Sequence, residues 1–206
     1  MTMSDFTEQS ADRFPNKSGI LSQSPWFTTG LRSCYTCPCI LFSYAAEDIK
    51  MSLERAESYL KEKGFAGHII IPEHSSATVA EAAEALGCTP GMIAKTLSFL
   101  QDDRPVLILA EGTARIDNKK YKARFGCKAK MIPGDQVENL IGHDIGGVCP
   151  FGINSGVTVY LDESLKIHDT VFPAAGTDHS AVRLTISELE QCCDSPEWID
   201  VCKMPE

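Results

Sequence analysis

The pattern of apolar and polar positions changes character near residue 50. From residue 51 onward, segments show either the 3.6-residue period of helices or the alternation of strands. Residues 1–49 are rich in Ser, Thr, Pro and Asn and sustain neither period. We therefore predict a poorly ordered N-terminal extension over residues 1–49 and a folded domain over residues 50–206. Met51 opens the first clean helix and is an alternative start of the natural chain.

Five helices are expected where capping signals flank a periodic apolar stretch. The signals are Ser52 as an N-cap, capping boxes over residues 78–81 and 185–188, helical patterns over residues 118–125 and 133–141, and C-capping glycines at Gly87 and Gly126. Strands are expected over residues 68–71, 93–100, 105–110 and 157–161, near residue 172 and over residues 181–184. Helices do not separate every pair of strands, so the pattern favours a mixed α/β (α+β) domain with a mixed sheet or barrel.

Composition narrows the class of protein. The 206 residues are 43% hydrophobic and 23% charged, as in an ordinary globular protein. No apolar run is long enough for a membrane span, and no basic-then-apolar leader is visible. Nine irregularly spaced cysteines in such a chain are expected to be reduced thiols, which favours a cytoplasmic protein. The net charge of −9 argues against a surface that binds nucleic acid broadly, and DNA is not an expected partner.

Lys95 is the first candidate functional residue. Alternation places it on the same strand face as Ile93, Leu97 and Phe99, where a charge is costly. One interpretation is a lysine at the sheet rim whose ammonium reaches solvent. The other is an ammonium held in a cleft to meet an anion or a developing oxyanion.

Two loops are further candidates. Residues 146–152 read Gly-Gly-Val-Cys-Pro-Phe-Gly, and such glycines let a backbone approach a ligand and present free N–H groups to an oxyanion. Residues 174–180 read Ala-Ala-Gly-Thr-Asp-His-Ser and join two predicted strands, as a loop that lines a pocket would. An ordinary tight turn and a solvated connection are the alternatives.

The Ala-Lys-Thr-Leu strand and these two loops, in this order, resemble the YbaK/EbsC family. That family is related to the editing domain of bacterial prolyl-tRNA synthetase. The resemblance runs from about residue 51 to about residue 193. It implies a mixed, β-barrel-like sheet flanked by helices. It also implies a trans-acting aminoacyl-tRNA deacylase that hydrolyses mischarged tRNA. The expected substrate is mostly proline tRNA carrying Cys, Ala or another small amino acid, and prolyl-tRNA synthetase is a possible partner. No cofactor and no metal are expected.

The resemblance also implies roles for individual residues. It assigns catalysis to Lys95, Gly146 and Gly147, and substrate binding to Val148, Cys149, Pro150, Phe151, Gly152, Gly176, Thr177, Asp178, His179 and Ser180. Related members often carry serine at the position of Cys149, which argues against a thiol nucleophile. The attacking group would be a water oriented by the ribose hydroxyl of the tRNA, with Lys95 as an anchor for the tRNA end.

A tRNA-binding surface is expected within residues 115–130, where seven basic residues stand against one acid, Asp117. The predicted tRNA-binding residues are Lys119, Lys120, Lys122, Arg124, Lys128 and Lys130, with Tyr121 available for stacking on a base. A solvated helix face is the alternative.

Two other functions remain open from the residues alone. One is a hydrolase with Cys149 as its nucleophile, although spacing reveals no Ser-His-Asp or Cys-His arrangement. The other is a non-catalytic protein that binds nucleotides or aminoacyl-tRNA. The run of Cys34, Cys37 and Cys39 lacks a second half, so a zinc site is not expected. Four histidines are predicted at the surface or at helix caps: His68, His74, His143 and His168.

Overall fold

The structure is a computed structural model that describes residues 51–72 and 78–205. The predicted extension over residues 1–49, with its cysteine run, lies outside the described residues, as does His74.

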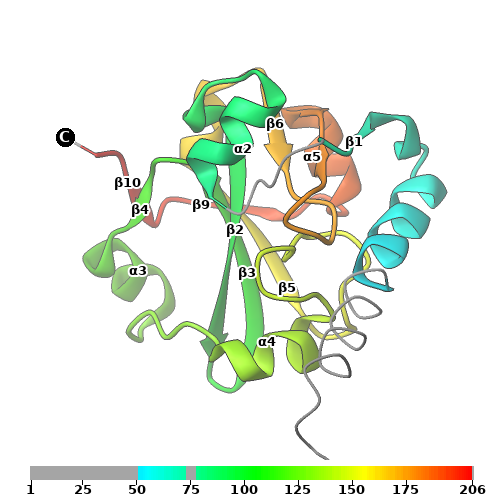
Figure 1. The fold of residues 1–206 in the computed structure, drawn as a ribbon. Coiled ribbons are helices and arrows are strands. Elements are labelled where there is room, and N and C mark those ends of the chain that lie inside the picture. The colour runs from blue at the N-terminus through cyan, green and yellow to red at the C-terminus, as the bar shows by residue number, and fades with distance from the viewer. Residues whose placement is uncertain (1–50, 73–77, 206) are drawn as a thin grey trace, which may run out of the picture. The chain divides into compact units, whose positions relative to one another are not determined.

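A mixed six-stranded sheet forms the centre of the domain, in the order β8-β6-β2-β3-β5-β9 (Figure 1). Its strands are β2 (Ile93–Gln101), β3 (Arg104–Glu111), β5 (Thr158–Asp162), β6 (Thr170–Pro173), β8 (Leu184–Thr185) and β9 (Glu197–Ile199). The β2–β3 and β6–β8 pairs are antiparallel, and the other three pairs are parallel. The sheet curls into a half-barrel, which confirms the predicted mixed α/β, barrel-like class.

Two small pairings complete the strands. β1 (Ile69–Ile70) pairs with β7 (Ala181–Val182), and β4 (Arg115–Ile116) pairs with β10 (Cys202–Lys203), both antiparallel. β4, β9 and β10 were not predicted, because strands of two or three residues are too short for alternation to show.

Capping chemistry fixes the helices. They are residues 51–62, α2 (Val79–Leu86), α3 (Asn118–Phe125), α4 (Gly134–Ile141) and α5 (Ile186–Cys192), with 3-10 turns η1 (Ala66–His68), η2 (Pro90–Met92) and η3 (Glu163–Ile167). Both predicted capping boxes are confirmed, and Gly87 and Gly126 end their helices in the left-handed conformation. The prediction that Ser52 is an N-cap is wrong, because residues 51 and 52 are already helical.

Helices cover both faces of the sheet, so β3 is buried on both sides (Figure 1). Leu109 belongs to the cluster that includes Leu60 from the first helix, whereas Ile108 packs with Tyr121 from α3. Alternate residues of one strand thus enter two cores. No helix within residues 51–72 and 78–205 is long and apolar enough to cross a membrane.

Candidate active site

The candidate site lies at a gap in the strand pairing along β2. β6 pairs with β2 only at Ile93 and Ala94, and farther along the Ser98 carbonyl accepts from the Ile132 N–H (3.1 Å). Between these points, no strand in the described part of the chain covers this edge. The backbone N–H and C=O groups of Ser98 point away from β3. Because this direction alternates along a strand, those of Thr96 point into the gap as well. A cavity of about 390 Å³ opens here.

The cavity brings together three segments that are far apart in the sequence. Its lining includes one predicted residue from β2 and others from both loops: Lys95, Gly146, Val148, Thr177, Asp178 and Ser180. The other predicted residues do not line it: Gly147, Cys149, Pro150, Phe151, Gly152, Gly176 and His179.

Lys95 is held at the edge of this cavity by backbone carbonyls. It pairs with Ala110 across the sheet and leaves the same face as Leu97, as alternation predicts. Its ammonium donates to the Gly112 carbonyl (2.9 Å) and to the Ala114 carbonyl. The side chain is partly buried, and desolvation lowers its pKa. The ammonium of Lys95 is therefore held by two carbonyls. This differs from the alternative of a rim lysine whose ammonium only meets solvent.

Close backbone packing explains two of the glycines. A Cβ on Gly147 would lie 2.1 Å from the Gly176 carbonyl oxygen, so the two loops touch backbone to backbone. Gly176 has φ +90°, and a Cβ there would lie 2.4 Å from the Ser52 carbonyl oxygen of the first helix. Any larger residue would push the loops apart. The predicted catalytic part of Gly147 stays a prediction.

The second loop is fixed by its own hydroxyls. The Thr177 hydroxyl donates to Ser180 Oγ (2.8 Å), and the His179 N–H donates to Thr177 Oγ1 (3.2 Å). His179 Nδ1 lies 2.6 Å from an oxygen of Asp178. Among the described residues that line the cavity, Asp178 is the carboxylate and Lys95 is the cation. The residues that line the cavity thus include one cation and one carboxylate.

Several cavity residues were missed by sequence analysis. Thr96 and Ser98 line the cavity from the β2 face opposite to that of Lys95. Alternation from Lys95 could have identified both as a polar pair. The apolar walls were not predictable, because α2, α4 and the Phe172 region meet only in the folded chain: Val79, Ala82, Leu86, Ile132, Val137 and Phe172.

Cys149 lies in a buried hydrogen-bonded chain away from the cavity. Its Sγ is 3.5 Å from His143 Nε2, and His143 Nδ1 is 2.7 Å from Ser52 Oγ. Sequence spacing did not reveal the contact between Cys149 and His143. His143 was predicted at the surface or at a helix cap, and the surface position is wrong because its side chain, like that of Cys149, is 0% exposed. Burial raises the pKa of the Cys149 thiol to about 12 and lowers the pKa of His143. A neutral, inaccessible thiol is unsuited to nucleophilic attack.

The comparison with known families identifies the fold and its role. Residues 73–192 match the model of the aminoacyl-tRNA editing domain. The chain belongs to this family. An editing role in translation follows from this membership.

Individual proteins are similar to this chain over different shares of their length. The uncharacterized protein YwhH of Bacillus subtilis is 47% identical over 154 residues, which cover 74% of this chain and 98% of that protein. The proline–tRNA ligase of Limosilactobacillus fermentum is 30% identical over 95 residues, which cover 43% of this chain and 17% of the ligase. A crystal structure described as a candidate trans-editing enzyme for prolyl-tRNA synthetase has a TM-score of 0.68 and 31% identity, and covers 74% of this chain and 97% of that one.

The basic segment, residues 115–130, includes α3 and ends beside Met131 of the cavity lining. All six predicted tRNA-binding residues are exposed, and Lys130 directly precedes Met131 at the cavity rim. Lys120 pairs with Asp200 (2.6 Å) and Arg124 pairs with Glu197 (2.5 Å). Both acids come from the C-terminal segment whose strands were not predicted. Within the described residues, the other four have no ion-pair partner: Lys119, Lys122, Lys128 and Lys130.

Tyr121 is not available for stacking, which corrects the sequence-based interpretation. The side chain is 0% exposed and packs against Phe99 and Phe125. Burial also raises the pKa of its hydroxyl to about 12. The helix turns this aromatic residue to the core while its lysines face solvent.

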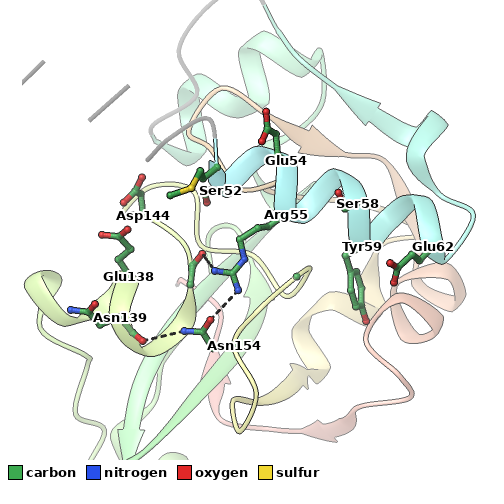
Figure 2. Close-up of a pocket in the computed structure, with 13 residues that line it drawn as sticks. Ser52, Glu54, Arg55, Ser58, Tyr59, Glu62, Glu138, Asn139, Asp144 and Asn154 are labelled. Carbon is green, nitrogen blue, oxygen red and sulfur yellow. Dashed lines mark hydrogen bonds between the residues drawn. The ribbon is translucent and has the colours of Figure 1, made fainter. Parts of the chain in front are cut away.

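A second and larger hollow of about 730 Å³ lies between the first helix and α4 (Figure 2). Arg55 bridges it, donating to the Gly142 carbonyl (3.2 Å) and to Asn154 Oδ1 (2.9 Å). Four acidic residues also line it: Glu54, Glu62, Glu138 and Asp144. We name it the acidic groove. A surface of this charge repels the phosphates of a nucleic acid.

Proposed function

We propose that this editing domain hydrolyses the ester bond of mischarged aminoacyl-tRNA in trans. The substrate would be proline tRNA that carries Cys, Ala or another small amino acid. The observation that carries the proposal is the convergence of Lys95, the loop at Gly146 and Val148, and the loop at residues 177–180 on one cavity. A volume of about 390 Å³ is suited to an aminoacyl group with part of its ribose.

The two charges of the cavity match the charges of such a substrate. Lys95 uses two of its three N–H groups on Gly112 and Ala114, and the third would donate to an oxygen of the terminal phosphate or the ester. The carboxylate of Asp178 would receive the α-ammonium of the aminoacyl group. Together they would orient the ester between the two loops, and apolar walls such as Val148 and Phe172 would enclose a small side chain.

Hydrolysis then needs two things: groups that stabilise an oxyanion, and a nucleophile. Backbone N–H groups of the loop beginning at Gly146 would supply the first, other than that of Gly147, which already donates to the Asp144 carbonyl (3.1 Å). One such donor contributes roughly 100- to 1000-fold in other hydrolases. Water oriented by the ribose hydroxyl would supply the second. The burial of Cys149 makes the thiol-hydrolase alternative the weaker one.

The approach of the tRNA would follow the basic segment. Lys128 and Lys130 are exposed, and Lys130 directly precedes Met131 in the cavity lining. Acceptor-stem phosphates would lie along these lysines while the terminal aminoacyl group enters. Prolyl-tRNA synthetase would be the partner that supplies mischarged tRNA, and the reaction would take place in the cytoplasm.

A turnover assay with a panel of mischarged tRNAs tests this function. We expect hydrolysis of proline tRNA carrying Ala, Cys or Ser, and no hydrolysis of correctly charged proline tRNA. If the same tRNAs bind without turnover, the protein is a non-catalytic binding protein rather than an enzyme. If no member of the panel is bound or hydrolysed, the proposal is rejected.

A further inference from the structure

The turn that follows β3 holds the ammonium of Lys95. Both carbonyls that accept from it, those of Gly112 and Ala114, belong to this turn of residues 112–114. A lysine side chain is long and flexible, so two acceptors on one rigid turn restrict it strongly. The position of the ammonium therefore depends on the conformation of the turn.

A buried carboxylate fixes that conformation. Glu111 ends β3 and is 2% exposed. Its Oε2 accepts from the Thr113 N–H (2.7 Å), the Ala114 N–H (2.6 Å) and the Thr113 hydroxyl (2.8 Å). Charge-assisted bonds of this kind are stronger than neutral ones, and they compensate the burial of the charge. All of these bonds go to the turn.

Two glycines leave room for this arrangement. A Cβ on Gly91 would lie 2.4 Å from Glu111 Oε1, so the carboxylate packs directly on the backbone of η2. A Cβ on Gly112 would lie 2.0 Å from the Pro90 carbonyl oxygen, so the turn does the same. Carboxylate and turn are thus enclosed as one packed unit.

We propose that Glu111 is a positioning residue for Lys95, acting through the carbonyls of the 112–114 turn. Across the sheet Glu111 pairs with Ala94 and Lys95 pairs with Ala110, so the two side chains leave opposite faces and Glu111 acts on the ammonium indirectly. The proposal rests on the function proposed above, because it gives Lys95 its precise place beside the substrate.

The charges around Lys95 give the inference a specific signature. Burial lowers the Lys95 pKa most, Cys202 and Glu111 raise it, and Arg115 lowers it. On its far side, Glu111 Oε1 lies 3.9 Å from His168 Nε2. Removing the charge of Glu111 therefore lowers the Lys95 pKa further. The Lys95 amine must be protonated to bind an anion. The alkaline limb of the pH profile of kcat/KM therefore moves to lower pH.

Two substitutions separate charge from geometry. Glu111→Gln keeps an oxygen for the two N–H groups, so we expect near-normal kcat/KM at neutral pH with the alkaline limb shifted to lower pH. Glu111→Ala leaves those N–H groups without their acceptor, and we expect a loss of roughly 10- to 100-fold in kcat/KM, as for other misplaced groups. Independently of activity, ¹³Cε NMR titration of Lys95, assigned with Lys95→Arg, should report the lowered pKa in Glu111→Gln.

Glu188→Gln is the control. Glu188 also holds a backbone turn, because its carboxylate accepts from the Thr185 N–H (2.8 Å) and the Thr185 hydroxyl (2.9 Å), and it is not among the groups that shift the Lys95 pKa. We expect it to leave the Lys95 titration unchanged. An unchanged titration in Glu111→Gln, or an equal shift in Glu188→Gln, would overturn the inference. If the wild-type protein shows no deacylase activity, the proposed function is rejected. The Lys95 titration would still decide whether Glu111 positions Lys95.

Discussion

Two hollows of this domain differ in size and in charge, and the smaller one carries the predicted site residues. The acidic groove is the larger, at about 730 Å³, and its described charged residues are four carboxylates and Arg55, which is already bonded to Gly142 and Asn154. The cavity at the gap along β2, which we call the β2 cavity, has a volume of about 390 Å³, and its lining includes one cation and one carboxylate. The basic segment leads to its rim. Volume alone would select the groove.

Charge and loop geometry, rather than volume, therefore distinguish the candidate site. A tRNA end brings phosphates, an ester and an α-ammonium, and of these two hollows the β2 cavity is the one whose lining combines a cation, a carboxylate and both predicted loops. The gap along β2 also places backbone groups at the cavity wall, whereas the groove is a seam between two helices.

Removal of the cavity cation should have the largest effect. In Lys95→Ala we expect kcat/KM for mischarged tRNA to fall by roughly 100-fold or more, because the anchor for the tRNA end is lost. Circular dichroism and thermal unfolding check that the fold survives. The comparison variant is Glu54→Gln/Glu138→Gln in the acidic groove, for which activity within about twofold of wild type is expected. A larger loss in the groove variant than in Lys95→Ala would reverse the assignment.

Charge reversal beside the cavity rim should have the next effect. In Lys128→Glu/Lys130→Glu we expect KM for tRNA to rise by about tenfold at low salt, with a flatter salt dependence and nearly unchanged kcat. Lys61→Glu/Arg183→Glu alters two exposed cations elsewhere and serves as control. Equal effects in both pairs would show that total charge, not this surface, attracts tRNA.

Substitution of the buried thiol should hardly affect catalysis. We expect Cys149→Ala to keep kcat/KM within about threefold of wild type while it loses about 1–2 kcal/mol of stability through the small cavity it creates. Urea unfolding and deacylation assays measure the two quantities. A loss of more than about 100-fold in a folded variant would restore the thiol-hydrolase alternative.

The smallest effect should be a pH dependence of stability from His143. Burial holds its folded-state pKa below the unfolded value of about 6.5. As pH falls through that unfolded value, the unfolded chain takes up a proton that the native chain does not, so stability decreases. The free energy of unfolding should therefore decline less steeply from pH 7 to pH 5 in His143→Gln than in wild type. Parallel declines would contradict this contribution.

Local signals made much of the fold predictable. The capping boxes at Thr78 and Thr185 and the C-cap at Gly126 involve neighbours within four residues, so the sequence displays them directly. β9 and β10 are two or three residues long and exist because distant strands receive them. Their acids, Asp200 and Glu197, also neutralise part of the basic segment, which local charge counting could not show.

The candidate site was predictable in its motifs but not in its walls. Lys95, Gly146 and Thr177 were all predicted, and they line one cavity. The buried contact between Cys149 and His143 depends on how the loop folds over the first helix, and spacing carries no trace of it. The same limit hid the turn at residues 112–114, because Lys95 reaches it only through the β2–β3 pairing.

Locating a bound substrate analogue tests the central claim most directly. A hydrolysis-resistant amide analogue of alanyl-adenosine, titrated into ¹⁵N-labelled protein, reports its position through changes in amide chemical shifts. We predict saturable changes at Thr96, Gly146 and Thr177 around the β2 cavity, with little change at Arg55 and Asn154. Saturable changes confined to the acidic groove would contradict the account.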